Sequence, residues 1–230
     1  PWSCAARPRT RPRLGLEAGR RQELARLAQP LVTGLDAAQR AREQGLSASR
    51  RTIRASGLAI RAVHRGEVDA AQRRTVEAEE ALREAQEALR PHPRLAYAGF
   101  LHDAEKEYAE ALLTAALVDG RPLLGADRTG VGTAAWLCGL AEAASELRRH
   151  LLDRVRAGEL DRGEELLGVM EDVYDLLITI DYPDALTGGL RRTTDALRAV
   201  LERSRADVTT TVMQARLQAA LEAHRPEGAD

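Results

Sequence analysis

Four glutamates on two predicted helices are the residues of this chain best suited to chemistry. Glu107 and Glu110 stand three residues apart in one segment, and Glu142 and Glu146 stand four apart in another. Because a helix advances about 100° per residue, these spacings place each pair on one helix face. Two such faces brought together in a bundle would form a carboxylate cage for a hard divalent cation such as Mg²⁺. That arrangement suits phosphodiester hydrolysis, in which a metal ion stabilises charge on phosphate oxygens and supplies an activated water.

The alternative interpretation places both pairs on solvated helix faces, where acidic residues at these spacings are common. The surrounding sequence favours partial burial instead. Apolar and small residues surround the first pair between 104 and 116, and the uncharged run 134–141 directly precedes Glu142. A carboxylate at the edge of a buried run needs a partner, a proton or a metal ion. A metal site is one of these three outcomes.

A stripe of arginines is a second candidate, here for binding phosphate. The stripe consists of Arg50, Arg54, Arg61 and Arg65, which lie within about 60° of one another on a helix. Arginine is suited to bidentate phosphate recognition. The alternative is a solvated face paired with a glutamate-rich helix that follows. Its acidic residues are Glu77, Glu79, Glu80, Glu84 and Glu87.

The remaining polar residues form no recognisable motif. The five histidines lack paired-ligand spacing, and only His102 lies near an acidic pair in sequence, where it would orient water or phosphate or serve a surface or capping role. Cys4 and Cys138 have no metal-ligand spacing, and Cys138 is expected to be a buried thiol. Neither glycine-rich segment, 130–134 or 187–189, has the ending of a phosphate-binding P-loop.

Seven helices are predicted to position these residues, because Ala, Leu, Arg and Glu dominate the chain and turn residues separate the helical patterns. They are expected at 16–31, 36–65, 68–89, 95–118, 133–157, 161–180 and 183–221. An interruption of the last near Gly188 and Gly189 is left open. The segment 161–180 is apolar on most sides, which predicts that it is the central helix.

Composition indicates a single all-α domain. The chain has 230 residues, 44% of them hydrophobic, and a formal net charge of -1, so any polyanion must bind to local patches. With 3% aromatic residues, a stacking platform for bases is excluded. No apolar stretch is long enough to span a membrane. Residues 1–15 are basic without a signal core and are expected to be disordered, 16–224 to form the helical domain, and 225–230 to be a flexible tail. A cytoplasmic location is the default expectation.

Two longer segments resemble the translin family, in its archaeal and bacterial-type branch. The first is Tyr-Ala-Gly-Phe-Leu-His-Asp-Ala-Glu-Lys-Glu-Tyr-Ala-Glu-Ala at 97–111. The second is Tyr-Pro-Asp-Ala-Leu-Thr-Gly-Gly-Leu-Arg-Arg-Thr-Thr-Asp at 182–195. The resemblance extends from about Asp36 to Thr211. It implies a seven-helix all-α protomer that assembles into a hollow oligomer, typically an octamer, and binds RNA or single-stranded DNA on its inner surface.

The resemblance also implies a catalytic site. In this family, translin-associated factor X carries a Mg²⁺-dependent endoribonuclease site. Its motif Leu-Gln-Glu-Tyr-Val-Glu-Ala is similar to residues 105–111, and its motif Gly-Val-Ala-Asp-Leu-Thr-Gly-Glu-Leu is similar to residues 139–147, with Glu142 in place of the aspartate. The matching acidic positions, which take the catalytic and metal-binding roles, are Glu107, Glu110, Glu142 and Glu146.

Three functions are consistent with these patterns. The first is a hydrolase, an endoribonuclease that uses Mg²⁺ or Mn²⁺ bound by the four carboxylates while the arginine stripe holds the strand. The second is a non-catalytic oligomer that binds RNA or single-stranded DNA and whose acidic cluster is a structural network. The third is a scaffold for a partner subunit.

Overall fold

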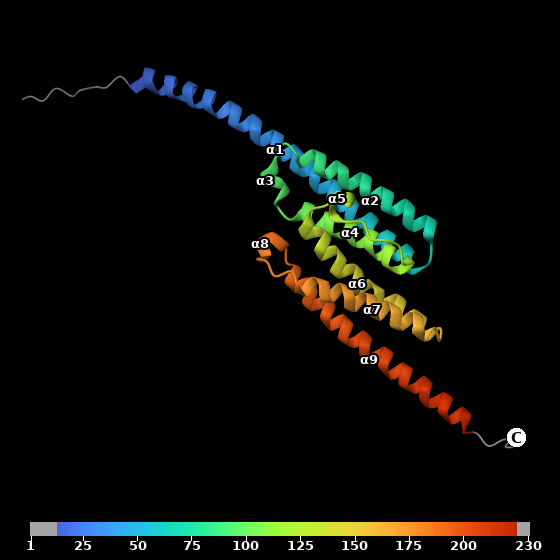
Figure 1. Ribbon diagram of the computed structural model, residues 1–230. Helices are drawn as coiled ribbons and strands as arrows, with labels where there is room; N and C mark the ends of the chain where they lie inside the picture. Colours follow the sequence, from blue (N-terminus) through green and yellow to red (C-terminus); the bar gives the residue numbers. More distant parts are fainter. Residues whose placement is uncertain (1–12, 225–230) are drawn as a thin grey trace, which may run out of the picture.

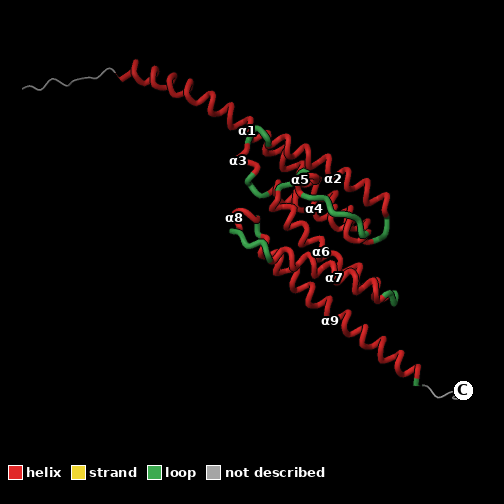
Figure 2. The backbone as a smooth tube through the Cα atoms, in the orientation of Figure 1, coloured by secondary structure: helices red, strands yellow, loops and turns green. Residues whose placement is uncertain are grey.

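The computed structural model describes residues 13–224, and this range is helical without strands (Figures 1 and 2). The all-α, single-domain prediction is confirmed. Six helices are long, and three others have four residues each. They are α1 (Arg13–His64), α2 (Val68–Leu89), α3 (Pro93–Ala96), α4 (Phe100–Asp119), α5 (Ala126–Thr129), α6 (Thr133–Arg156), α7 (Leu160–Ile178), α8 (Asp184–Thr187) and α9 (Leu190–Ala223).

The first two predicted helices form one continuous helix, α1, of 52 residues. The break expected between residues 31 and 36 is absent, although Pro30 lies inside the helix. An internal proline costs a helix about 3 kcal/mol because it removes one backbone hydrogen bond. Strong helix formers precede Pro30 between residues 23 and 29, and the Thr33 hydroxyl donates a hydrogen bond to the carbonyl oxygen of Gln29.

Glycines divide two other predicted helices. The segment 95–118 is split by Gly99, whose φ of 91° lies in the left-handed region, into α3 and α4. The segment 183–221 is split at Gly188 and Gly189, with φ values of 60° and 90°, into α8 and α9. A side chain would be strained at these φ values, so glycine permits the two turns. The interruption considered near Gly188 is therefore present.

The long helices pack in three layers. The hairpin of α1 and α2 covers α4, the pair α4 and α6 forms the middle, and α7 and α9 lie against the far side of α6 (Figure 1). Helix α6 therefore occupies the centre, and the prediction that 161–180 is the central helix is wrong. In α7, Leu176 and Ile178 are half exposed, because an apolar pattern does not distinguish core from apolar surface.

Small side chains fill the contact between α4 and α6. Ala104 and Ala109 on α4, and Ala141, Ala143 and Ala144 on α6, are buried members of one cluster. A second cluster of larger residues joins α6, α7 and α9. Its buried members are Leu147, Leu151, Leu166, Met170, Leu201 and Val208. The apolar layer between α4 and α6 is thus made of small side chains, and the layer between α6 and the pair α7 and α9 of larger ones. The small side chains let polar side chains on α4 and α6 approach one another.

Side-chain hydrogen bonds fix the loop that leads into α6. Glu105 of α4 accepts hydrogen bonds from Gln86 Nε2 at 2.9 Å and from the backbone N–H of Gly132 at 3.1 Å. The indole N–H of Trp136 donates to the carbonyl oxygen of Leu124 at 2.9 Å. The start of α6 is therefore tied to both α2 and α4.

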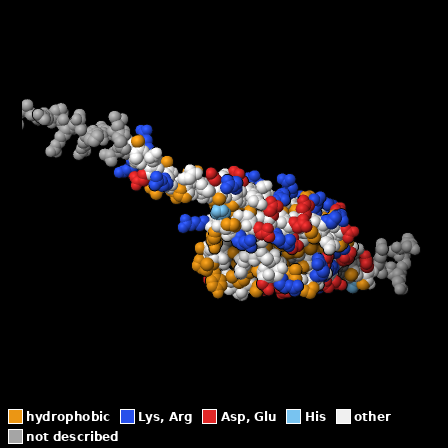
Figure 3. Space-filling model, turned by 90° about the horizontal axis from the view of Figure 1, so that it is seen from above, with side chains coloured by type: hydrophobic (Ala, Val, Ile, Leu, Met, Phe, Trp, Pro, Cys, Tyr) orange, Lys and Arg blue, Asp and Glu red, His pale blue; other side chains and the backbone are white. Residues whose placement is uncertain are grey.

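Both end helices extend beyond the body of the molecule and carry exposed apolar residues (Figures 1 and 3). On the outer part of α1 these are Leu24, Leu27, Leu31, Val32 and Leu35, and at the end of α9 they are Met213, Leu217 and Leu221. The predicted disordered stretch 1–15 and the predicted tail 225–230 lie largely outside the described residues, although α1 already begins at Arg13. Within the described range, no helix has the length and apolar character that a membrane span requires.

Candidate metal centre

Three of the four predicted glutamates meet where α4 packs against α6. Glu107 and Glu110 of α4 and Glu142 of α6 each place one carboxylate oxygen within 4.8 Å of the others. Glu110 is 8% exposed, whereas Glu107 and Glu142 are partly open to solvent. Among the described residues this is the one group of three or more His, Cys, Asp or Glu side chains arranged in this way. The group has an inner, buried member and two members that solvent can reach.

Gly139 permits the close approach of the two helices. A Cβ atom at this position would lie 2.9 Å from the Cβ of Ala109, 2.9 Å from the carbonyl oxygen of Lys106 and 3.0 Å from the backbone nitrogen of Glu110. Those contacts include α4 backbone, which cannot move aside as a flexible side chain can. Gly139 thus sets the separation of α4 and α6 beside Glu110. Its role was not predicted from the sequence, where it counted only as part of an uncharged run.

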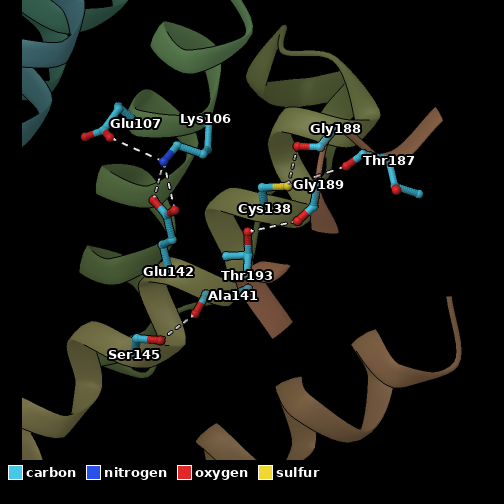
Figure 4. Close-up of polar contacts among 10 residues, drawn as sticks. All are labelled: Lys106, Glu107, Cys138, Ala141, Glu142, Ser145, Thr187, Gly188, Gly189 and Thr193. Atoms are coloured by element: carbon cyan, nitrogen blue, oxygen red, sulfur yellow. Dashed lines mark hydrogen bonds and ion pairs between the residues drawn. The ribbon is translucent and has the colours of Figure 1, made fainter. Parts of the chain in front are cut away.

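Lys106 places its ammonium among the carboxylates (Figure 4). Its Nζ lies 2.8 Å and 2.7 Å from the two carboxylate oxygens of Glu142, and 3.5 Å from Glu107 Oε1. One ammonium faces three carboxyl groups, so the cluster retains an excess of negative charge. Burial lowers the pKa of Lys106, but the hydrogen bonds and charge of Glu142, with the charges of Glu107 and Glu110, raise it on balance. Lys106 therefore stays charged.

Burial and mutual repulsion favour the protonated form of Glu110. Burial, followed by the charges of Glu142, Glu107 and Glu146, raises the pKa of Glu110 to about 9. Burial also raises the pKa of Glu107, and Glu142 adds to this shift while Lys106 opposes it. Without further positive charge, the cluster holds a proton at neutral pH. A divalent cation would supply the charge needed to ionise all three groups.

Glu146, the fourth predicted ligand, lies outside this group of three. Its Oε2 is 2.5 Å from Nε2 of His64, at the end of α1. This hydrogen bond lowers the pKa of Glu146, although burial opposes the shift. The His64 side chain is 3% exposed, and its ring centroid lies 5.1 Å from that of His150. Glu146 is thus an ionised carboxylate held by histidine beside the cluster.

His64 was not predicted as part of the site, and no signal in the sequence marks it. It stands 82 residues before Glu146 and lacks any paired spacing. His102, the histidine singled out from its sequence position, instead packs at the turn after α8, where a Cβ on Gly188 would lie 2.6 Å from its Cε1. Cys138 is a buried free thiol, as predicted, with Sγ 3.5 Å from the carbonyl oxygen of Thr187.

The predicted arginine stripe lies on an exposed face of α1. All four members, Arg50, Arg54, Arg61 and Arg65, are exposed. Arg65 donates hydrogen bonds of 2.7 and 2.8 Å to Glu67, and none of the other three forms an ion pair within the described part of the chain.

The acidic residues of α2 find other partners. Glu84 pairs with Arg51, which lies outside the stripe, and Glu79 pairs with Arg83 on its own helix. Over the face seen in Figure 3, basic and acidic side chains are interspersed. The stripe is therefore neither joined to the carboxylate cluster nor neutralised by α2.

Comparison with solved structures gives two close matches to AfC3PO. A complex of AfC3PO with duplex RNA has a TM-score of 0.74 and 32% sequence identity, covering 82% of this chain and 97% of that one. A second crystal structure of AfC3PO has a TM-score of 0.72 and 31% identity, covering 82% and 98%. Apo-NeC3PO shares the fold at a TM-score of 0.72 with 18% identity, covering 80% and 96%.

Among curated proteins, an uncharacterized protein of Methanocaldococcus jannaschii is 28% identical over 182 residues, which cover 77% of this chain and 79% of that protein. No model of a known protein family matches the chain.

Proposed function

Because the chain belongs to the C3PO/translin family, we propose that it binds RNA and cleaves it in a metal-dependent reaction at the cluster formed by Glu107, Glu110 and Glu142. The observation that carries this proposal is the meeting of these three carboxylates across α4 and α6. Glu142 lies 36 residues after Lys106, the residue that directly precedes Glu107. The three carboxylates therefore come from two separate segments of the sequence and converge only in the folded chain.

The donor set fits a hard divalent cation. Mg²⁺ and Mn²⁺ prefer carboxylate oxygens, and a site with one or two open sides leaves room for water and for phosphate oxygens. Here Glu110 is buried, while the side chains of Glu107 and Glu142 are 28% and 31% exposed. Burial, and then the charges of the neighbouring carboxylates, raises the pKa of Glu110 to about 9, so a divalent cation would favour the ionised form of all three groups. Mg²⁺ or Mn²⁺ is therefore the cofactor we propose.

The residues in and around the cluster have three different roles in this proposal. Glu107, Glu110 and Glu142 would hold the cation, and a bound cation stabilises charge on phosphate oxygens and lowers the pKa of a bound water. Glu146, kept ionised by His64, lies beside the cluster and would orient water or accept a proton. Gly139 keeps α4 and α6 close enough for the carboxylates to act together.

The exposed arginines supply a binding surface for the RNA backbone. Arg50, Arg54 and Arg61 are exposed and without an acidic partner in the described range, so their guanidinium groups are open to phosphate. The complex of the similar AfC3PO with duplex RNA supports RNA as the ligand. Single-stranded DNA, which also carries one charged phosphate per nucleotide, is expected to compete for this surface.

We further propose that the chain assembles with copies of itself, as an octamer. The outer part of α1 and the end of α9 leave apolar side chains in the open, among them Leu27 at 61% and Leu217 at 60% exposure. Large apolar side chains gathered on projecting helices mark surfaces that bury against protein. Light scattering of the purified chain, compared with a Leu27→Glu, Leu31→Glu variant, tests the assembly.

A second function, RNA binding without catalysis, is favoured by one observation. Lys106 and Glu142 form a bidentate ion pair of 2.7 and 2.8 Å, which would stabilise the contact between α4 and α6 without any metal ion. In that case the cluster is a structural network. The two functions differ in whether RNA turnover depends on a divalent cation and on Glu107.

Cleavage of labelled RNA separates the two functions. Purified protein is incubated with single-stranded and duplex RNA in Mg²⁺, in Mn²⁺ or in EDTA, beside Glu107→Gln and the control Glu80→Gln, which changes an exposed glutamate on α2. The proposal expects cleavage by the wild type and Glu80→Gln with either metal ion, no cleavage in EDTA, and a loss of at least 100-fold in Glu107→Gln with RNA binding intact. RNA that is bound but never cut would leave the second function.

A further inference from the structure

Lys106 is the only lysine among the 34 lysine and arginine residues of the chain, and it stands inside the carboxylate cluster. An ammonium is a compact point charge on a flexible stem of four carbons, whereas a guanidinium is a wide planar fork. Of the two cationic side chains, lysine is the one whose charge resembles a metal ion in size. The position between Glu107 and Glu142 in Figure 4 therefore suits lysine and not arginine.

The Lys106 ammonium lies where a bridging cation would bind. It contacts both oxygens of Glu142, at 2.8 and 2.7 Å, and Oε1 of Glu107 at 3.5 Å. These two carboxylates come from different helices, so the ammonium joins α4 to α6 by charge. A divalent cation bound by the same oxygens would repel it at short range. The two cations therefore exclude each other from the cluster.

The surroundings allow Lys106 to move. Its side chain is 20% exposed, so the stem has a path to solvent. Glu107 and Glu110 are fixed by the backbone of α4, and Glu142 by that of α6, with Gly139 holding the two helices together. Withdrawal of the lysine side chain would open the cluster without unfolding either helix.

We propose that Lys106 is an internal counter-cation: its ammonium occupies the carboxylate cluster in the metal-free protein and leaves the cluster when a divalent cation binds. This inference rests on the metal site proposed above and adds how that site is controlled. The exchange makes the metal-free state stable, because the carboxylates keep a partner. It also weakens metal binding, since the incoming cation must displace the lysine.

The single lysine permits a direct test on the unmodified protein. An amine-reactive acetylating reagent is applied to the wild type in EDTA and in saturating Mn²⁺, and acetylation of Lys106 is followed by mass spectrometry, with the α-amino group at the N-terminus as the internal control. The exchange predicts that Mn²⁺ increases the acetylation rate of Lys106 at least fivefold and leaves that of the α-amino group unchanged. An equal or lower rate at Lys106 in Mn²⁺ overturns the exchange.

Substitution tests the same inference by affinity. Lys106→Met and Lys106→Gln remove the charge and shorten the side chain by one atom. Calorimetric titration with Mn²⁺ is expected to show at least tenfold tighter binding to both variants than to the wild type, together with a lower Tm of both variants in EDTA. Unchanged or weaker Mn²⁺ affinity overturns the exchange but leaves the metal site standing. Absence of Mn²⁺ binding by all three chains overturns the metal site, and the exchange with it.

Discussion

Replacement of Glu110 by glutamine should stabilise the metal-free protein at pH 8 and have little effect on its stability near pH 5. Glutamine has nearly the same shape as the protonated carboxyl group and cannot ionise. In the wild type, burial and then the charges of the neighbouring glutamates raise the pKa of Glu110 to about 9, against an ordinary value of 4.5. Between these two values the folded protein holds a proton that the unfolded chain has lost. The variant lacks this difference.

The sign and size of the effect follow from proton linkage. Because the folded state binds the extra proton, the stability that Glu110 contributes is full below pH 4.5 and is lost as the pH rises toward about 9. One proton corresponds to a slope of at most about 1.4 kcal/mol per pH unit. Between pH 6 and pH 8, the wild type should lose about 1–3 kcal/mol of unfolding free energy relative to Glu110→Gln.

Urea unfolding in EDTA, followed by circular dichroism at 222 nm, measures this difference at pH 5, 6, 7 and 8. Glu80→Gln, on an exposed position of α2, is the matched control and should keep the wild-type pH dependence. Parallel stability curves for the wild type and Glu110→Gln would refute the reasoning, because they would mean that Glu110 is ionised in the folded protein without a metal ion.

Three further predictions test the packing and the surfaces around the cluster. Gly139→Ala should push α4 away from α6, which should lower the unfolding free energy by about 1–3 kcal/mol and weaken Mn²⁺ binding. The control Gly168→Ala, with no atom within 4 Å of the added Cβ, should be neutral or stabilising. Equal effects of the two substitutions would contradict the close approach of α4 and α6. His64→Ala should destabilise the protein by about 1–3 kcal/mol at pH 7 in urea unfolding, because the carboxylate of Glu146 on α6 loses its hydrogen-bond partner. An unchanged urea midpoint would show that this hydrogen bond does not contribute to stability. Arg54→Ala with Arg61→Ala should weaken binding of single-stranded RNA and reduce the slope of log affinity against log salt by about 1.4, and an unchanged slope in filter binding would place the RNA elsewhere.

The sequence predicted the local part of the candidate site and not the part that depends on packing. Spacing placed Glu107 and Glu110 on one face of a helix, and the uncharged run before Glu142 predicted the burial that is found there. The partner of Glu146 could not be predicted, because His64 is 82 residues away and reaches it only through the packing of α1 on the middle layer. The role of Gly139 depends equally on which helix lies opposite.

The same distinction applies to the fold. Helix type and most boundaries follow from propensity, as in α2, whose predicted bounds of 68–89 are those observed. Propensity overestimated the effect of Pro30, across which α1 continues. It also could not rank the apolar helices by burial: α7 keeps Leu176 and Ile178 half exposed, whereas α6, with as many charged residues as α7, lies at the centre.

The number of Mn²⁺ ions bound per chain tests the central claim most directly. Equilibrium dialysis of the wild type against Mn²⁺ is compared with Glu107→Gln, Glu142→Gln and the control Glu80→Gln. A cation site formed by Glu107, Glu110 and Glu142 predicts one tightly bound Mn²⁺ per chain in the wild type and control, and none at the same free concentration in the two cluster variants. Equal Mn²⁺ binding by all four proteins, or binding by none, would contradict it.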